Sequence, residues 1–342
     1  MLDDLKLIHD RDSEDAIGVA AKQWQQLTYD YEVDLPEFGE ISNIVLAGMG
    51  GSSFPGVYLK SWPGTLAPME IIRDYTLPEY VNAKTLFISS SHSGNTEETL
   101  SALRQAEEKG AQIVVISSGG KLAERAEEKA YPLFRIPGGI QPRMCSFYFL
   151  AAFMQILEPL GLVPQGSRQE LMEVSEWLKG EIDDLLAEVP TAGNPAKQLA
   201  LELIGKSVVV YSGPKLFPAA NKFKICLNES AKNIAWVNQY PEFNHNEFIG
   251  WSSHPEQKPY AVVEFRSTLE NERVQKRFEI SERLLSGKRP QPEVIVPKGD
   301  TVIRQLLWSS NFGDFTSLYV AVLNGVDPTP VELVEKLKQL LG

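Results

Sequence analysis

The sequence predicts an α/β protein with two doubly wound, flavodoxin-like parallel sheets that are joined by a helical connection. Short β-branched runs alternate with helical patterns in the first half, and a second series of such runs follows a stretch of helical character. The length of 342 residues is also more than one hydrophobic core usually serves. We therefore expect two domains, over residues 1–155 and 156–342.

Five apolar runs in the first half predict the strands of one parallel sheet. After the third run, Leu100, Leu103 and Ala106 have helical spacing, and Lys109-Gly110 is typical of the end of a helix. This pattern indicates a βαβ unit with a right-handed crossover. The five predicted strands are Asn43–Ala47, Glu70–Arg73, Thr85–Ser89, Ile113–Ile116 and Leu133–Ile136.

The pattern becomes helical between about Ser146 and Glu188, which predicts the connection between the two domains. Three further strands and a terminal helix from Val331 follow, with helices between the strands. The predicted strands of this second series are Ser207–Tyr211, Ala261–Phe265 and Glu293–Val296.

Charge and composition exclude several classes of partner. The chain has 33 basic and 45 acidic residues, a net charge of −12, so it has no field that attracts nucleic acid or anionic lipid. No apolar stretch reaches the roughly 18 residues of a membrane span, and the N-terminus lacks the pattern of a signal peptide. Cys145 and Cys226 lie in separate apolar runs, which is typical of buried thiols. We expect a cytoplasmic protein with no nucleic-acid or membrane partner.

A glycine-rich segment, Gly48–Ser53, follows the first predicted strand. Ligands of open α/β sheets bind at the ends of such strands, and glycines let the backbone approach a ligand closely. Ser53 stands where a dinucleotide fingerprint has its third glycine, so the pattern does not favour NAD. The alternative is an ordinary tight turn from strand to helix.

A hydroxyl-rich loop, Ser89–Thr99, runs from the third predicted strand into a helix. Free backbone N–H groups, the helix dipole and several hydroxyls would together bind a phosphoryl group. The alternative is helix capping, in which Asn95 and Glu98 form the cap. Glu97 and Glu98 would repel a phosphate unless they point away from it. The residues alone leave both interpretations open.

The histidines and cysteines do not form a metal-binding pattern. The chain has four histidines but no His-x-x-x-His pair, and its two cysteines are far apart. We therefore expect no metal site.

Both loops resemble those of the SIS (sugar isomerase) domain, with Gly-x-Gly-Gly-Ser at 48–52 and Ser-x-Ser-Gly-Asn-Thr-Glu-Glu-Thr at 91–99. Three further motifs, at 141–143, 228–230 and 241–247, resemble the bifunctional phosphoglucose/phosphomannose isomerases of archaea and bacteria. The resemblance covers nearly the whole chain. It implies two SIS domains and a cofactor-free enzyme that interconverts glucose 6-phosphate and/or mannose 6-phosphate with fructose 6-phosphate through a cis-enediol.

The resemblance also assigns roles to individual residues. Arg143 would stabilise the enediolate, and Glu229 would move the proton between C1 and C2. His245 and Lys338 would open the sugar ring. In this family the histidine comes from the neighbouring subunit, which implies a homodimer with shared active sites. The residues that would bind the sugar phosphate are Gly50, Gly51, Ser52, Ser91, Ser93 and Thr96.

Four points stay open in the sequence. Lys336 is close enough to Lys338 to be confused with it, and Val331 stands where the family has Thr or Gln, so the preference between glucose and mannose phosphates is undetermined. Glu229 lies away from the apolar stripe of its predicted helix, which fits a solvated glutamate or one that faces a cleft or subunit interface. SIS domains also serve as sugar-phosphate sensors, although Glu229 and His245 favour an enzyme.

Overall fold

A computed structural model describes residues 1–253 and 259–341. The chain divides into two compact units, which we call the first-sheet unit (23–176) and the second-sheet unit (1–22 and 177–342). This division differs from the predicted boundary after residue 155, which would cut through helix α6 (Ser146–Leu157). α6 is apolar on nearly all sides and its buried side chains belong to the core of the first-sheet unit. The N-terminal segment packs with the second sheet, where Asn311 Nδ2 donates to the Ala20 carbonyl oxygen (3.1 Å).

The first-sheet unit contains a five-stranded sheet of order β2-β1-β3-β4-β5 in which every pairing is parallel. This is the flavodoxin-like order that the sequence predicts. The strands read as continuous apolar runs because both faces of the sheet are covered, and all seven residues of β3 are buried. The strands are β1 Asn43–Ala47, β2 Met69–Ile72, β3 Thr85–Ser91, β4 Gln112–Ser117 and β5 Leu133–Arg135.

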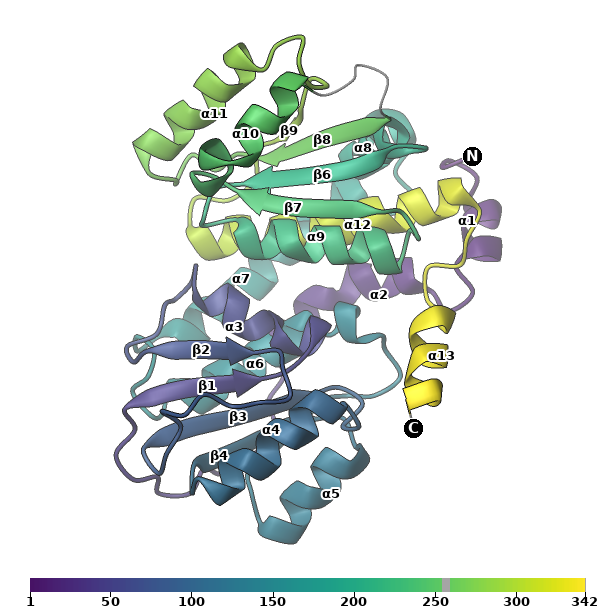
Figure 1. Ribbon diagram of the computed structural model, residues 1–342. Coiled ribbons are helices and arrows are strands. Elements are labelled where there is room, and N and C mark those ends of the chain that lie inside the picture. The colour runs from purple at the N-terminus through teal and green to yellow at the C-terminus, as the bar shows by residue number, and fades with distance from the viewer. Residues whose placement is uncertain (254–258, 342) are drawn as a thin grey trace. The chain divides into compact units, whose positions relative to one another are not determined.

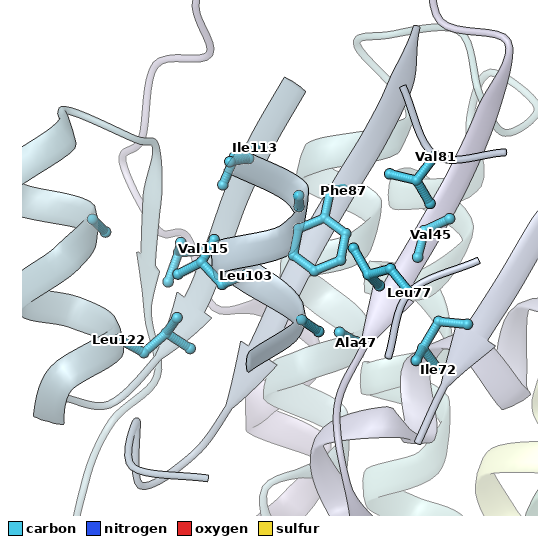
Figure 2. Packing of buried hydrophobic residues seen from close by; sticks show 13 residues of the cluster. Val45, Ala47, Ile72, Leu77, Val81, Phe87, Leu103, Ile113, Val115 and Leu122 are labelled. Carbon is cyan, nitrogen blue, oxygen red and sulfur yellow. The ribbon is translucent and has the colours of Figure 1, made fainter. Parts of the chain in front are cut away.

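Helices cover both faces of this sheet, with α4 and α5 on one face and α3 and α6 on the other (Figure 1). On the α4 and α5 face, Phe87 lies at the centre of a core that Val45, Val115, Leu103 and Leu122 also line (Figure 2). The α-helices are α3 Phe54–Leu59, α4 Glu97–Glu108, α5 Gly120–Lys129, α6, and α7 Ser167–Glu181, which continues past residue 176. The 3-10 turns are η1 Gln23–Thr28, η2 Gly50–Ser53 and η3 Pro142–Met144.

The second-sheet unit repeats this arrangement with a parallel sheet of order β7-β6-β8-β9. Strand β7 is not among the predicted strands. It lies at the sheet edge, its residues are mostly half-exposed, and Trp236 is 48% exposed, so the segment lacks a buried apolar run. The strands are β6 Ser207–Ser212, β7 Ala235–Gln239, β8 Tyr260–Phe265 and β9 Glu293–Ile295.

Helix α9 (Phe217–Glu229) packs along α12 (Val302–Asn324) beside this sheet, and α11 (Glu272–Leu284) lies on the opposite face (Figure 1). Thr301 caps α12, and Gly325 ends it with a left-handed φ of 69°. Within the described ranges, no helix is both long and apolar enough to cross a bilayer. The other helices and turns are α1 Leu5–Arg11, α2 Ala16–Lys22, η4 Asp183–Leu185, η5 Thr191–Gly193, α8 Pro195–Leu203, η6 Glu242–His245, α10 Glu247–Gly250, η7 Trp251–Ser253 and α13 Glu332–Leu341.

A buried charge cluster lies near the carboxyl end of β8. The Glu264 carboxylate is fully buried and accepts hydrogen bonds from Arg266 Nε (2.8 Å) and from Arg289 Nη2 (2.6 Å). Two guanidinium groups therefore compensate the cost of burying this carboxylate.

Candidate active site

The glycine-rich turn η2 lies directly after β1, at the carboxyl edge of the first sheet. Gly50 has a left-handed φ of 48°. Gly51 approaches the next segment so closely that a Cβ there would lie 2.7 Å from the Pro142 carbonyl oxygen. Ser52 connects the turn to β3, because its Oγ accepts from the His92 N–H (3.0 Å) and its carbonyl accepts from Ser90 Oγ (2.8 Å).

The β3–α4 loop brings its hydroxyls together at the neighbouring strand end. Ser91 Oγ and Thr96 Oγ1 lie 2.8 Å apart, and the Gly94 N–H donates to Ser91 Oγ (3.1 Å). Ser93 Oγ accepts from the Asn95 N–H (3.3 Å), and Ser93 is exposed. β1 and β3 are adjacent in the sheet while their helices lie on opposite faces, so both loops stand at the switch point where such sheets bind ligands.

The capping interpretation of this loop is wrong for Asn95. Thr96 is the N-cap residue of α4, and no side-chain hydrogen bond caps that helix. Asn95 Oδ1 instead accepts from the Lys121 N–H (3.1 Å), at the start of α5. Glu97 accepts from the Tyr75 hydroxyl (3.2 Å), so its carboxylate is turned toward Tyr75. The hydroxyls therefore surround a helix N-terminus that no side chain caps, an arrangement suited to an anion.

The third segment of the site carries Arg143, in turn η3 before α6. Arg143 is only 3% exposed, and its Nη1 lies 3.4 Å from Gln141 Oε1. The Cys145 N–H donates to the Pro142 carbonyl (3.1 Å), which closes the turn. η3 packs against η2 through the close approach of Gly51 to Pro142. The first-sheet unit thus assembles the glycines, the hydroxyls and one arginine of the predicted site.

Glu229, the predicted base, is the last residue of α9 in the second-sheet unit. The predicted apolar stripe of this helix is buried at Ala220, Phe223 and Cys226, whereas Glu229 is half-buried. The preceding Asn228 fixes the end of the helix, because its Oδ1 accepts from the Ala235 N–H at the start of β7 (2.9 Å).

His245 ends η6, in the same unit, and its side chain is exposed. Its neighbour Asn244 fastens the turn to α11: Asn244 Nδ2 donates to Ser281 Oγ (2.9 Å), and Arg277 Nη1 donates to Asn244 Oδ1 (3.2 Å). The turn is therefore held while the imidazole itself faces outward.

Lys338 and Lys336 lie on α13, where both are exposed. The apolar residues of this helix are exposed as well, with Leu333 at 84% and Leu337 at 57%. The exposure of α13 does not distinguish between the two lysines.

Sequence reasoning missed His92 and Cys145 as parts of the site. The imidazole Nε2 lies 3.6 Å from Cys145 Sγ, which connects the β3–α4 loop to the Arg143 segment. The position of His92 between Ser91 and Ser93 was the only signal, because contacts across 53 residues have no local pattern. Among the residues that the structure describes, no group of three or more His, Cys, Asp or Glu side chains is arranged to hold a metal.

Comparison with known proteins gives the family. A model described as the bacterial phospho-glucose isomerase C-terminal SIS domain matches residues 192–341. A bifunctional phosphoglucose/phosphomannose isomerase of Caldicellulosiruptor bescii is 36% identical over 309 residues, 89% of this chain and 90% of the relative. A D-glucosamine-6-phosphate 4-epimerase of Sulfolobus acidocaldarius is 35% identical over 236 residues, 68% of this chain and 72% of the relative.

The structural comparison agrees on the fold. A glucose-6-phosphate isomerase like protein from Thermus thermophilus superposes with a TM-score of 0.66 at 18% identity, covering 97% of this chain and 99% of that chain. This likeness confirms the predicted fold with two parallel α/β sheets. The sequence relatives are named as enzymes, as the resemblance predicts. The chain therefore belongs to the family of bifunctional phosphoglucose/phosphomannose isomerases.

Proposed function

We propose that this protein interconverts glucose 6-phosphate and/or mannose 6-phosphate with fructose 6-phosphate, without a cofactor. The observation that carries the proposal is the cluster at the first switch point. There Ser91 and Thr96 hydroxyls lie 2.8 Å apart beside the uncapped start of α4, with the buried Arg143 on the adjoining segment. Family membership supports the choice of a sugar phosphate as the ligand.

The phosphate is bound by hydroxyls and backbone N–H groups rather than by a cluster of cations. Ser52, Ser91, Ser93 and Thr96 supply hydroxyls, and Gly50 and Gly51 let the backbone come close. The positive end of the α4 dipole adds to this attraction. Such contacts form equally in the ground state and the transition state, so they hold the substrate without accelerating the chemical step.

Glu229 then moves one proton. In the open-chain aldose its carboxylate accepts the proton from C2, which leaves an enediolate, and the carboxylic acid returns the proton to C1 while a hydroxyl proton passes from O2 to O1. The Arg143 guanidinium stabilises the negative charge on those oxygens. Atoms and charge balance without a redox partner, so the reaction requires no nicotinamide.

His245 and Lys338 assist the opening of the sugar ring, in the roles that the family motifs assign to them. Both side chains are exposed, which fits groups that meet a ligand or a second chain. We propose that His245 acts on a sugar bound by the partner of a homodimer. Two chains related by a two-fold axis would then exchange one histidine each.

The decisive experiment supplies fructose 6-phosphate in deuterated water and follows the products by NMR. We expect glucose 6-phosphate or mannose 6-phosphate to appear with deuterium at C2, because the enediolate exchanges its proton with solvent. Addition of a chelator leaves the rate unchanged. Absence of both aldose phosphates would refute the proposal, and loss of activity with chelator would refute its cofactor-free form.

The 35% identical epimerase makes glucosamine 6-phosphate a necessary second substrate in this assay. Inversion at C4 with no aldose-ketose product would assign the chain to epimerase chemistry instead. Binding of sugar phosphates without any turnover would identify a sensor. The variant Glu229→Gln tests the isomerase assignment further. The amide keeps the shape of the side chain but cannot accept the proton, so we expect this variant to bind substrate without converting it.

The shared-histidine proposal is tested by mixing two inactive variants, Glu229→Gln and His245→Ala. If subunits exchange randomly, half of the dimers are mixed and each has one intact site, so about a quarter of the wild-type activity returns. A pull-down with differently tagged chains first establishes exchange. Demonstrated exchange without recovered activity means that His245 acts within its own chain or not at all.

A further inference from the structure

The side chain of His92 leaves the loop in which it stands and contacts the Arg143 segment instead. The ring donates a hydrogen bond to the backbone carbonyl of Pro137, and its Nε2 lies 3.6 Å from Cys145 Sγ. These two contacts lie before and after Arg143 in the chain. Burial lowers the pKa of His92 below its usual value and so favours the neutral ring, although the bond to Pro137 opposes this effect.

The backbone of His92 makes a separate set of hydrogen bonds, to Ser52 and Ser118. Its N–H donates to Ser52 Oγ (3.0 Å), and its carbonyl accepts from the N–H (3.1 Å) and the Oγ (2.5 Å) of Ser118. These bonds fix the phosphate-binding loops and do not depend on the identity of the side chain. Replacing the imidazole therefore affects the Arg143 segment while the loops keep their own hydrogen bonds.

The segment 137–145 needs such support because it has little regular structure. Its only turn is η3, closed by the Met144 N–H to Gln141 (2.8 Å) and the Cys145 N–H to Pro142 (3.1 Å). Cys145 Sγ also lies 3.7 Å from the Ile140 carbonyl oxygen, so the thiol stands between the imidazole and the backbone of the turn. The imidazole is thus in contact with both ends of the stretch that carries the guanidinium.

We propose that His92 is a positioning residue that holds segment 137–145, and with it Arg143, in register with the phosphate loop. The proposal rests on the proposed function, in which Arg143 stabilises the enediolate. His92 touches no reacting atom in this scheme. It sets the distance between the group that binds the phosphate and the group that stabilises the charge several atoms away.

The test compares kcat and KM of His92→Phe with those of the wild type. Phenylalanine keeps the ring and its packing near Phe149, at 6.5 Å between ring centroids, but removes both polar contacts. We expect kcat to fall on the order of 10- to 100-fold, because small misplacements of a stabilising group have such effects, and KM to change less than about threefold. A wild-type kcat, or a rise in KM alone, overturns the proposal.

Rescue and control variants separate positioning from simple loss of structure. In His92→Asn the amide stands near the place of Nδ1, and in His92→Gln near that of Nε2, so at least one restores the bond to Pro137 and most of kcat. His9→Phe, at an exposed histidine on α1, changes neither constant. If neither amide restores kcat although thermal unfolding matches the wild type, the proposal is wrong.

Hydrogen exchange gives a readout that does not need activity. In His92→Phe, the amides of Met144 and Cys145 should exchange faster, while that of His92 itself, bonded to Ser52, stays protected. Unchanged exchange of the 138–145 amides overturns the proposal even if kcat falls. If the wild-type chain converts no substrate while His92→Phe still shows this faster exchange, the proposed function is refuted and the structural link remains intact.

Discussion

Lys222 of α9 and Asp314 of α12 form an ion pair in which both side chains are fully buried. Cys226, one turn further along α9, donates from its thiol to the other carboxylate oxygen of Asp314 (3.2 Å). Glu229 ends the same helix less than one further turn away. The pair therefore fixes α9 along its length and in rotation, and with it the direction of the proposed base.

We predict that Lys222→Met lowers the free energy of unfolding by about 3–5 kcal/mol, because it leaves the Asp314 carboxylate buried without its cation. The double variant Lys222→Met, Asp314→Leu should be less destabilised than the single one, since no charge stays behind. Chemical denaturation measures both. A single variant within about 1 kcal/mol of the wild type would show that the carboxylate is neutral or solvated.

Gly51→Ala should separate the two segments that form the phosphate and arginine parts of the site. The added Cβ would lie 2.7 Å from the Pro142 carbonyl oxygen and 2.9 Å from its carbon, so backbone must shift. We expect a loss of about 1–3 kcal/mol in stability and a lower kcat/KM. Gly138→Ala is the matched control, because its Cβ meets nothing within 4 Å. Equal behaviour of the two variants contradicts the close packing.

Removal of two hydroxyls from the β3–α4 loop should weaken substrate binding. For Ser93→Ala combined with Thr96→Val we predict a higher KM and a largely unchanged kcat, since phosphate contacts are the same in ground and transition states. Steady-state kinetics with fructose 6-phosphate measures both constants. A loss confined to kcat would mean that these hydroxyls act at the reacting carbons instead.

His92 should also make stability depend on pH. Its pKa is lowered in the folded protein, chiefly by burial, so below about pH 6.5 the unfolded chain binds the proton more readily. The unfolding free energy therefore falls as the pH drops from 6.5 through the folded-state pKa, and this part of the slope disappears in His92→Gln. Denaturation at pH 7.5 and 5.5 measures the difference. Identical slopes in both proteins would contradict the lowered pKa.

The strands that carry the site were predictable because buried parallel strands leave apolar runs, as at the predicted segments Asn43–Ala47 and Thr85–Ser89, the latter extending to Ser91 in the structure. Strand β7 was not predictable, because it is an edge strand in which Trp236 is exposed. It pairs with β6 through backbone hydrogen bonds, which leave no pattern of apolar residues in the sequence. The role of Asn95 was mispredicted for a similar reason, because its contact also leaves no local pattern in the sequence. Its partner Lys121 lies 26 residues away, and the local spacing to Glu98 indicated a cap that does not form.

The role of individual residues divides in the same way. The family motifs predicted that Ser91, Thr96 and Arg143 belong to one site. The structure brings the loops that carry them together in the first-sheet unit. Helical arithmetic correctly put Glu229 off the apolar stripe but could not say how far it is exposed. The contact of His92 with Cys145 depends on how two loops pack, which neither periodicity nor local propensity encodes.

The buried Glu264 gives the second sheet a property that the first lacks. Glu264 of β8 pairs with Tyr211 of β6. The equivalent pair in the first sheet is Ser89 of β3 with Ala47 of β1, so Ser89 occupies the position that corresponds to Glu264. Where the first sheet ends in hydroxyls, the second carries an anion already neutralised by Arg266 and Arg289. An incoming phosphate there would have to displace the protein's own carboxylate. Although the two sheets have the same topology, we therefore expect only the first to bind the ligand. A ligand titration should show a single equivalent of sugar phosphate bound per chain.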